Sequence, residues 1–197
     1  MSSADAKESG QISGAAVPAS VKLAVSAVFA SLIAVGTILS IPLPPPLYEL
    51  TWSPAIYLAL SALSDRWTAF SATAIGGFIG EAYNVAFRGG GSPIYPFGIV
   101  WARGPETLIV AWAAKKGTRW LVASMVLATV FETVAFYIPD GFFYSYGLFQ
   151  YGNPTSLSAG FTAASGDLFT MIDLAYIPIA IAIIYAARPA FRRLGFR

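Results

Sequence analysis

The sequence predicts an all-α integral membrane protein, a bundle of six transmembrane helices with a long aromatic extracellular loop before the last helix. Hydrophobic residues make up 56% of the 197 residues and charged residues only 11%, whereas soluble domains carry about 25% charged residues. Apolar runs recur along the chain, and roughly 20 apolar residues are enough to cross a bilayer. Lys and Arg collect in alternate connections between these runs, which is typical of membrane proteins.

The first predicted span, Val21–Ile41, follows a tail of small and charged residues (1–20) that we expect to be flexible and cytoplasmic. This tail does not resemble a signal peptide, because the apolar run after it is too long and leads into prolines instead of a cleavage site. The run IPLPPPL, Ile41–Leu47, ends the span, since consecutive prolines cannot continue a helix.

Five further spans are predicted: Pro54–Leu63, Trp67–Phe87, Tyr95–Ala114, Trp120–Ile138 and Leu168–Ala187. The first of these five is short. The stretch from Trp52 to Ser64 has only 13 residues, which is about 20 Å of helix against an apolar bilayer core of about 30 Å. Hydropathy therefore leaves open whether this segment crosses the membrane.

Positive charge decides the predicted topology, because Lys and Arg in short loops collect on the cytoplasmic side. If all six segments cross, one side holds Lys7, Lys22, Arg66, Lys115, Lys116, Arg119, Arg188, Arg192, Arg193 and Arg197. The other side then holds only Arg88, whereas the split is eight to three if the short segment does not cross. We therefore expect a multi-pass protein of the plasma membrane, with a membrane domain at 21–193 and both termini, including the basic C-terminus 194–197, in the cytoplasm.

Three connections then lie outside: Pro42–Ser53, Arg88–Ile94 and Pro139–Asp167. The last is long and carries many aromatic side chains: Phe142, Phe143, Tyr144, Tyr146, Phe149 and Tyr151. A loop of this length in a compact bundle is usually functional or disordered, and aromatic residues are rare in disordered segments. We expect a lid over a binding site; an interfacial aromatic belt is the alternative.

Polar and charged side chains inside the predicted spans lie at mid-depth or toward the outside. Glu81 and Asn84 belong to the third span, Arg103 and Glu106 to the fourth, Glu132 to the fifth and Asp173 to the sixth. Charges tolerated in a membrane face the bundle interior or a wet cavity, so this common depth predicts a water-filled cup that opens outward. The alternative is that Arg103 and Glu106, three residues apart on one helix face, pair with each other.

Several function classes are excluded by composition. The chain has no Cys and no His, which excludes disulfides, thiolate or imidazole metal sites and catalytic triads that use His. It also lacks a glycine-rich phosphate loop. We expect no catalytic residue, metal, cofactor or nucleic-acid partner, and a membrane enzyme is the least favoured class.

Small residues form stripes on two of the predicted spans. Ala72, Gly76 and Gly80 in the third span let another helix approach closely, and we expect them to pack inside the bundle. In the first span the small residues Ser26, Ala27, Ala30, Ser31 and Ala34 form two overlapping faces. These faces serve either the bundle or a partner protein.

These features resemble the substrate-binding (S) components of energy-coupling factor transporters, which import vitamins and related micronutrients. The resemblance covers roughly residues 22–193 and rests on LAVSAVFASLIAVGTILSIPLP, on SPAIYLALSALSDRWTAFSATAIGGFIGEAYN, on the Gly104–Pro105 pair in the fourth span and on the long loop before the last span. It implies a six-helix bundle that captures a vitamin-like ligand from outside and joins a membrane coupling subunit and two ATP-binding subunits.

The resemblance also implies roles for residues. An AxxxA-like stripe would dock the coupling subunit, through either Ser26, Ala30 and Ala34 or the neighbouring face of Ala27, Ser31 and Ala34. The substrate-binding residues that we predict are Glu81, Asn84, Arg103, Glu106, Glu132, Tyr144, Asn153 and Asp173.

Charge favours a cationic ligand. Seven acids lie at mid-depth or outside (Glu49, Glu81, Glu106, Glu132, Asp140, Asp167, Asp173), against Arg88 and Arg103, an excess of five negative charges. A focused negative potential attracts cations, and aromatic rings add cation–π contacts, so a thiamine-like or pyrimidine-like compound is the leading ligand. A stand-alone ion-coupled carrier or small cation channel, with these intramembrane carboxylates as its relay, remains the alternative.

Overall fold

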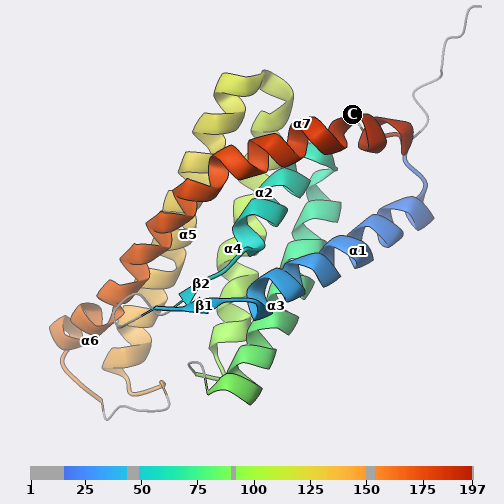
Figure 1. The fold of residues 1–197 in the computed structure, drawn as a ribbon. Helices are drawn as coiled ribbons and strands as arrows, with labels where there is room; N and C mark the ends of the chain where they lie inside the picture. Colours follow the sequence, from blue (N-terminus) through green and yellow to red (C-terminus); the bar gives the residue numbers. More distant parts are fainter. Residues whose placement is uncertain (1–15, 44–48, 90–91, 150–153, 197) are drawn as a thin grey trace, which may run out of the picture.

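The computed structural model describes residues 16–43, 49–89, 92–149 and 154–196. Its α-helices are α1 (Ala19–Ile38), α2 (Ser53–Leu63), α3 (Arg66–Arg88), α4 (Tyr95–Ala113), α5 (Thr118–Ser145), α6 (Leu157–Ala163) and α7 (Ile177–Arg193). Two 3-10 helices are η1 (Ala114–Lys116) and η2 (Ala164–Tyr176), and two-residue strands β1 (Ile41–Pro42) and β2 (Glu49–Leu50) pair antiparallel. The long helices run alternately in opposite directions (Figure 1), so the predicted all-α class is confirmed.

Three helical segments are long and apolar enough to cross a membrane: α1, α5 and the continuous stretch Leu157–Arg193. The chain is therefore a helical membrane protein. Helices α3 and α4 have 23 and 19 residues, which is about 34 and 28 Å of helix, but they carry polar and charged residues that lower their hydropathy. Helix α2 has only 11 residues.

The long loop expected at 139–167 is largely helical, which corrects that prediction for the described residues. Helix α5 continues through Pro139 to Ser145, and α6 and η2 follow from Leu157. Pro139 has no N–H to bond the carbonyl one turn back. The carbonyl of Ala135 instead accepts a hydrogen bond from Trp101 Nε1 at 3.1 Å, so the proline leaves no unpaired backbone acceptor there.

Helices α1 and α3 pack closely through small residues. A Cβ added at Gly76 would overlap the backbone of Ala30, and one at Gly80 would lie 2.9 Å from the carbonyl oxygen of Ala34. Ala72 is fully buried in the same interface of α3. The packing role predicted for the small residues of α3 is therefore confirmed.

This packing also decides between the two faces of α1. Ala30 and Ala34 are 8% and 7% exposed against α3, and Ser26 Oγ lies 3.3 Å from Ser71 Oγ. The stripe of Ser26, Ala30 and Ala34 therefore lies inside the bundle, which corrects the expectation that it docks a partner. Ala27 and Ser31 lie on the exposed side of α1. Large apolar side chains share that exposed side: Leu23, Val28, Leu32, Val35 and Leu39.

Short α2 is the buried centre of the bundle. Nine of its residues are buried, including Tyr57, Leu58 and Leu60 with no exposed surface, and it packs against α1, α3, α4 and α7. A helix that is apolar on all sides is stable only where neighbours surround it. This position brings Tyr57, the one large polar side chain of α2, into contact with the interior of the bundle.

A tight turn joins α2 to α3 at Asp65. Its side chain accepts hydrogen bonds from Trp67 N and Thr68 N at the start of α3 and lies 3.2 Å from Lys22 Nζ. Partial burial alone would raise the pKa of Asp65, but the hydrogen bonds from Thr68 and the Lys22 ammonium lower it below its ordinary value. This turn fixes the end of the bundle where α2, α4 and α7 finish.

The chain termini are only partly described. Residues 1–15 of the expected tail lie outside the described residues, and α1 already begins at Ala19. At the other end Phe196 is 4% exposed and its ring centre lies 5.5 Å from that of Phe191. The last described residues thus pack against the bundle.

Candidate functional site

Five side chains from four elements meet in the middle of the bundle and form what we call the central cluster: Tyr57, Arg103, Glu106, Glu132 and Asp173. Arg103 Nε donates to Glu132 Oε1 at 2.6 Å, and the hydroxyl of Tyr57 donates to Glu132 Oε2 at 3.3 Å. Glu106 and Asp173 both interact electrostatically with Glu132. Three carboxyl groups therefore surround one guanidinium.

The geometry of α4 directs two of these groups inward. Gly104 faces α3, where an added Cβ would lie 2.8 Å from the ring of Phe70. At 100° per residue, Arg103 and Glu106 then lie on the side of α4 that faces away from Phe70. The helix continues through Pro105, so the Gly–Pro pair allows close packing on one side and a charged face on the other.

Arg103 does not form its ion pair with Glu106, the acid nearest to it in the sequence. Arg103 pairs with Glu132 on α5, and its Nη1 also donates to Ser53 Oγ at 3.4 Å. The alternative in which Arg103 pairs with Glu106 is therefore wrong. Within the described residues, neither carboxyl oxygen of Glu106 has a hydrogen-bond partner. Glu106 is thus a fully buried carboxyl close to the Tyr57 hydroxyl, which already donates to Glu132. A buried carboxyl without a donor of its own is costly.

The central cluster is closed to solvent in this structure. Tyr57, Glu106 and Glu132 have no exposed surface, and Asp173 and Arg103 are 6% and 9% exposed. This corrects the expectation of a water-filled cup around these residues. A ligand can reach the cluster only if neighbouring helices move apart.

A 3-10 helix lines up polar groups beside the cluster. Asp167, Thr170, Asp173 and Tyr176 follow one another at intervals of three along η2, and in a 3-10 helix such residues eclipse each other on one face. In an α-helix, Asp167 and Tyr176 would lie on opposite sides. We call this row the polar stripe. Thr170 Oγ1 lies 2.7 Å from Thr133 Oγ1 of α5, so the stripe faces α5.

A second carboxyl pair lies at the start of the polar stripe. Asp140 of α5 and Asp167 are 3% and 7% exposed and lie within hydrogen-bonding reach of each other and of Tyr95 on α4. In each of the two carboxyls, the Oδ2 atom is buried with no hydrogen-bond partner in the described part of the chain. The stripe therefore connects two groups of buried carboxyls, one near the end of α5 and one at the centre.

The remaining predicted site residues are not part of the central cluster. Asn84 Nδ2 donates to the carbonyl of Thr37 on α1 at 3.3 Å, which places it at the α1–α3 interface. Glu81 is buried on α3 at 8% exposure, and Tyr144 lies in the last turn of α5. Asn153 lies outside the described residues. The structure thus brings together the charged members of the predicted set from α4, α5 and η2.

Sequence reasoning missed three groups that the structure adds: Tyr57, Ser53 and the pair of Asp140 and Asp167. Tyr57 could have been identified as the single phenol within an apolar segment. The two aspartates could have been identified by their position at the two boundaries of the expected loop. Among the described residues, no three acidic side chains are placed to hold a metal ion.

Comparison of the chain with protein-family models, curated proteins and solved structures gives no match.

Proposed function

We propose that this chain is the substrate-capture subunit of an ATP-driven importer of the energy-coupling factor type, which crosses the plasma membrane six times with both termini in the cytoplasm. The observation that carries the proposal is the composition of the central cluster. Three buried carboxyl groups face one guanidinium, and Glu106 lacks a hydrogen-bond partner within the described residues. A bound cation would supply the missing partner.

The chemistry of the cluster supports a small, positively charged or amine-bearing ligand. Glu106 and Asp173 would accept hydrogen bonds from it, and the ring of Tyr57 would offer a face for stacking or cation–π contact. Tyr57 already has the Arg103 guanidinium carbon 5.9 Å from its ring centre. A vitamin-like heterocycle with one positive charge, such as a thiamine-like compound or its pyrimidine precursor, fits this combination.

The direction of binding follows from where charge lies along the bundle. The carboxyl groups of Asp140 and Asp167 lie near the end of α5, while the cations of η1 and α7 lie at the opposite end. Basic residues mark the cytoplasmic side. The ligand would therefore arrive from the outside, at the end where α5 finishes, and pass along the polar stripe to the cluster.

The energy source would belong to partner proteins, because the sequence has no nucleotide-binding loop. The exposed face of α1, with Ala27 and Ser31 among large apolar side chains, is the surface on which we propose that a membrane coupling subunit docks. Small residues in such a face let a second helix approach closely. Two ATP-binding subunits would complete the importer.

Isothermal titration of the purified protein against a panel of vitamins tests the capture function. We expect a cationic compound to bind, and Glu106→Gln to weaken its binding by about tenfold or more, because a charge-assisted hydrogen bond is lost. Glu8→Gln, which removes the same charge from the N-terminal tail, is the matched control. Selective binding of an anionic vitamin, or equal affinity of the Glu106 variant and the parent protein, would contradict the proposal.

One observation favours a second candidate, an ion-coupled carrier that works alone. The polar stripe joins the carboxyl pair of Asp140 and Asp167 to the central cluster, and rows of buried acids are common in proton and sodium pathways. Uptake by the lone protein in liposomes, without ATP-binding subunits and with loss of uptake in Asp167→Asn, would establish this carrier. Binding without such uptake would support the capture subunit.

A further inference from the structure

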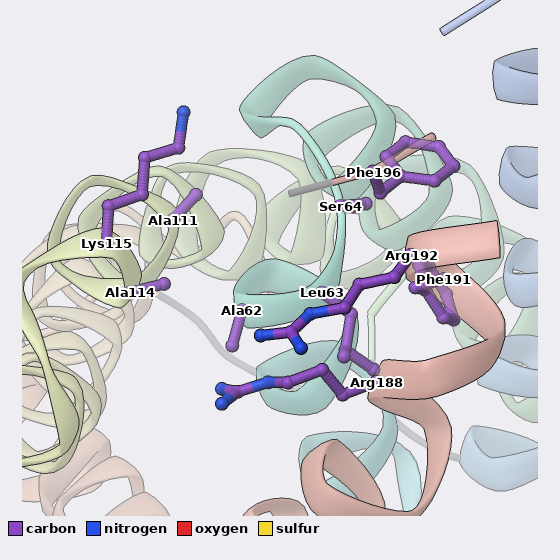
Figure 2. A pocket seen from close by; sticks show the side chains of 10 residues that line it. All are labelled: Ala62, Leu63, Ser64, Ala111, Ala114, Lys115, Arg188, Phe191, Arg192 and Phe196. Atoms are coloured by element: carbon purple, nitrogen blue, oxygen red, sulfur yellow. The ribbon is translucent and has the colours of Figure 1, made fainter. Parts of the chain in front are cut away.

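A cavity of about 290 Å³ lies at the end of the bundle opposite to the carboxyl pair of Asp140 and Asp167. It is lined by the end of α2, by the end of α4 with η1, and by the last turns of α7 (Figure 2). Apolar side chains such as Leu63 and Phe191 line its buried part, and three cations line it as well: Lys115, Arg188 and Arg192. We call it the basic pocket. Its volume far exceeds the room that one water needs.

The cations of the basic pocket are not neutralised by the fold. Its lining contains no acid, and within the described residues no carboxylate lies within 4 Å of Lys115, Arg188 or Arg192. The acid beside the pocket along the chain, Asp65, pairs with Lys22. Arg188 and Arg192 are four residues apart on α7 and extend side by side over the end of α2 (Figure 2). Like charges at this spacing repel each other, and an anion between them would turn the repulsion into attraction.

The depth of the basic pocket in the membrane is marked by tryptophans. Trp67, Trp112 and Trp120 are 59%, 65% and 59% exposed, and all three lie near the helix ends that surround the pocket. Lys116, next to Lys115, has its Nζ 3.1 Å from the ring centre of Trp112. Exposed Trp and Lys side chains gather at the level of lipid headgroups. The pocket therefore opens where phosphate groups of lipids lie.

From these observations we propose that the basic pocket binds a phosphate ester, namely the headgroup of an anionic lipid in the leaflet at this end of the bundle. Guanidinium groups match phosphate oxygens with paired hydrogen bonds. The apolar residues of the lining accept the first carbons of the lipid. The proposal depends only on the membrane location of the chain and is independent of the ligand of the central cluster.

Native mass spectrometry of the protein with phosphatidylglycerol or phosphatidylcholine tests this site. We expect a phosphatidylglycerol adduct that is about 30-fold weaker in the double variant Arg188→Gln, Arg192→Gln. The two arginines contribute about equally to the attraction of the lipid phosphate, and the variant removes both contributions. The matched control is Arg119→Gln, Arg193→Gln, which removes two cations outside the pocket lining and should leave the adduct unchanged. Equal binding of both lipids, or equal loss in the control, would overturn the proposal.

A second arm separates a lipid headgroup from a soluble phosphate. Inorganic phosphate and glycerol phosphate are added to the complex with phosphatidylglycerol. If neither displaces the lipid at millimolar concentration, the occupant is a lipid; if either displaces it fully, the phosphate site stands but a soluble phosphate ester fills it.

Variant stability must be checked in the same preparation. The double variant Arg188→Lys, Arg192→Lys keeps both charges, and we expect it to retain most of the lipid adduct. If the Gln variant unfolds, Lys115→Gln provides the test, because it changes an exposed side chain of the same pocket. A full adduct in Lys115→Gln together with loss in the Lys variant would contradict a charge-based site.

Discussion

The central cluster and the basic pocket are both groups of mostly like charges, but they are built differently. The cluster holds three carboxyls around one guanidinium, fully internal and closed. The pocket holds three cations without an acid in its lining and opens to the surface of the bundle. A buried charge needs a partner within the fold because desolvation is costly. A charge at the membrane surface can be left for an external partner.

The largest expected effect is on stability, and it tests whether the cluster depends on its internal partner. Glu132→Gln removes the carboxylate that holds Arg103, which leaves a buried guanidinium poorly compensated, and we expect it to cost about 3–5 kcal/mol of unfolding free energy. Thermal unfolding in detergent measures this. Replacing both Arg103 and Glu132 by Met should cost less than the single change. If the double variant costs as much as the sum of the single variants, the two side chains are not coupled.

Glu106→Gln separates binding from stability within the same cluster. Because Glu106 accepts no hydrogen bond within the described residues, its replacement should leave the unfolding temperature unchanged or higher. Ligand binding should fall by about 2 kcal/mol, the size of one charge-assisted hydrogen bond. Calorimetry and thermal unfolding of one preparation measure both quantities. A destabilised variant would show that Glu106 has a structural partner.

A variant of Asp65 tests whether the acid next to the basic pocket in the sequence affects stability, lipid binding or both. Asp65→Ala should cost about 1 kcal/mol, because the N-cap of α3 is lost, while the phosphatidylglycerol adduct stays unchanged. Its lowered pKa means that the carboxylate stabilises the fold at pH values above about 4, its ordinary pKa. That contribution is lost as the pH falls through the lowered value of the folded state. Parallel acid titrations of the parent and the variant, followed by unfolding temperature, measure the difference.

The smallest effect is predicted for the basic pocket without lipid. Arg188→Gln alone should change the unfolding free energy by only about 0.2–0.5 kcal/mol, and in the stabilising direction, because it relieves repulsion from Arg192. Unfolding in a zwitterionic detergent at low salt measures this change. A large loss of stability would mean that Arg188 has a partner within the fold, as Glu132 does, and would contradict the difference between the pocket and the cluster.

Local sequence pattern predicted much of this arrangement. The span expected at Tyr95–Ala114 ends within one residue of α4, and the role of Gly76 and Gly80 followed from their spacing alone. The depth of Glu132 and Asp173 in their spans likewise identified two members of the central cluster.

Features that depend on contacts between distant segments could not be predicted. Arg103 and Glu132 are 29 residues apart, and only the packing of α4 against α5 makes them partners instead of Arg103 and Glu106. The helical course of α5 through Pro139 depends on a donor from Trp101 on another helix. The 3-10 winding of η2 likewise does not follow from its pattern of apolar residues.

That winding has a mechanical consequence. The 13 residues of η2 extend about 26 Å as a 3-10 helix and would extend only about 20 Å as an α-helix. Conversion of η2 into an α-helix would therefore shorten the segment by about 6 Å and place Asp167 on the side of the helix opposite to Tyr176. Such a change would move Asp167 away from Asp140, its partner on α5.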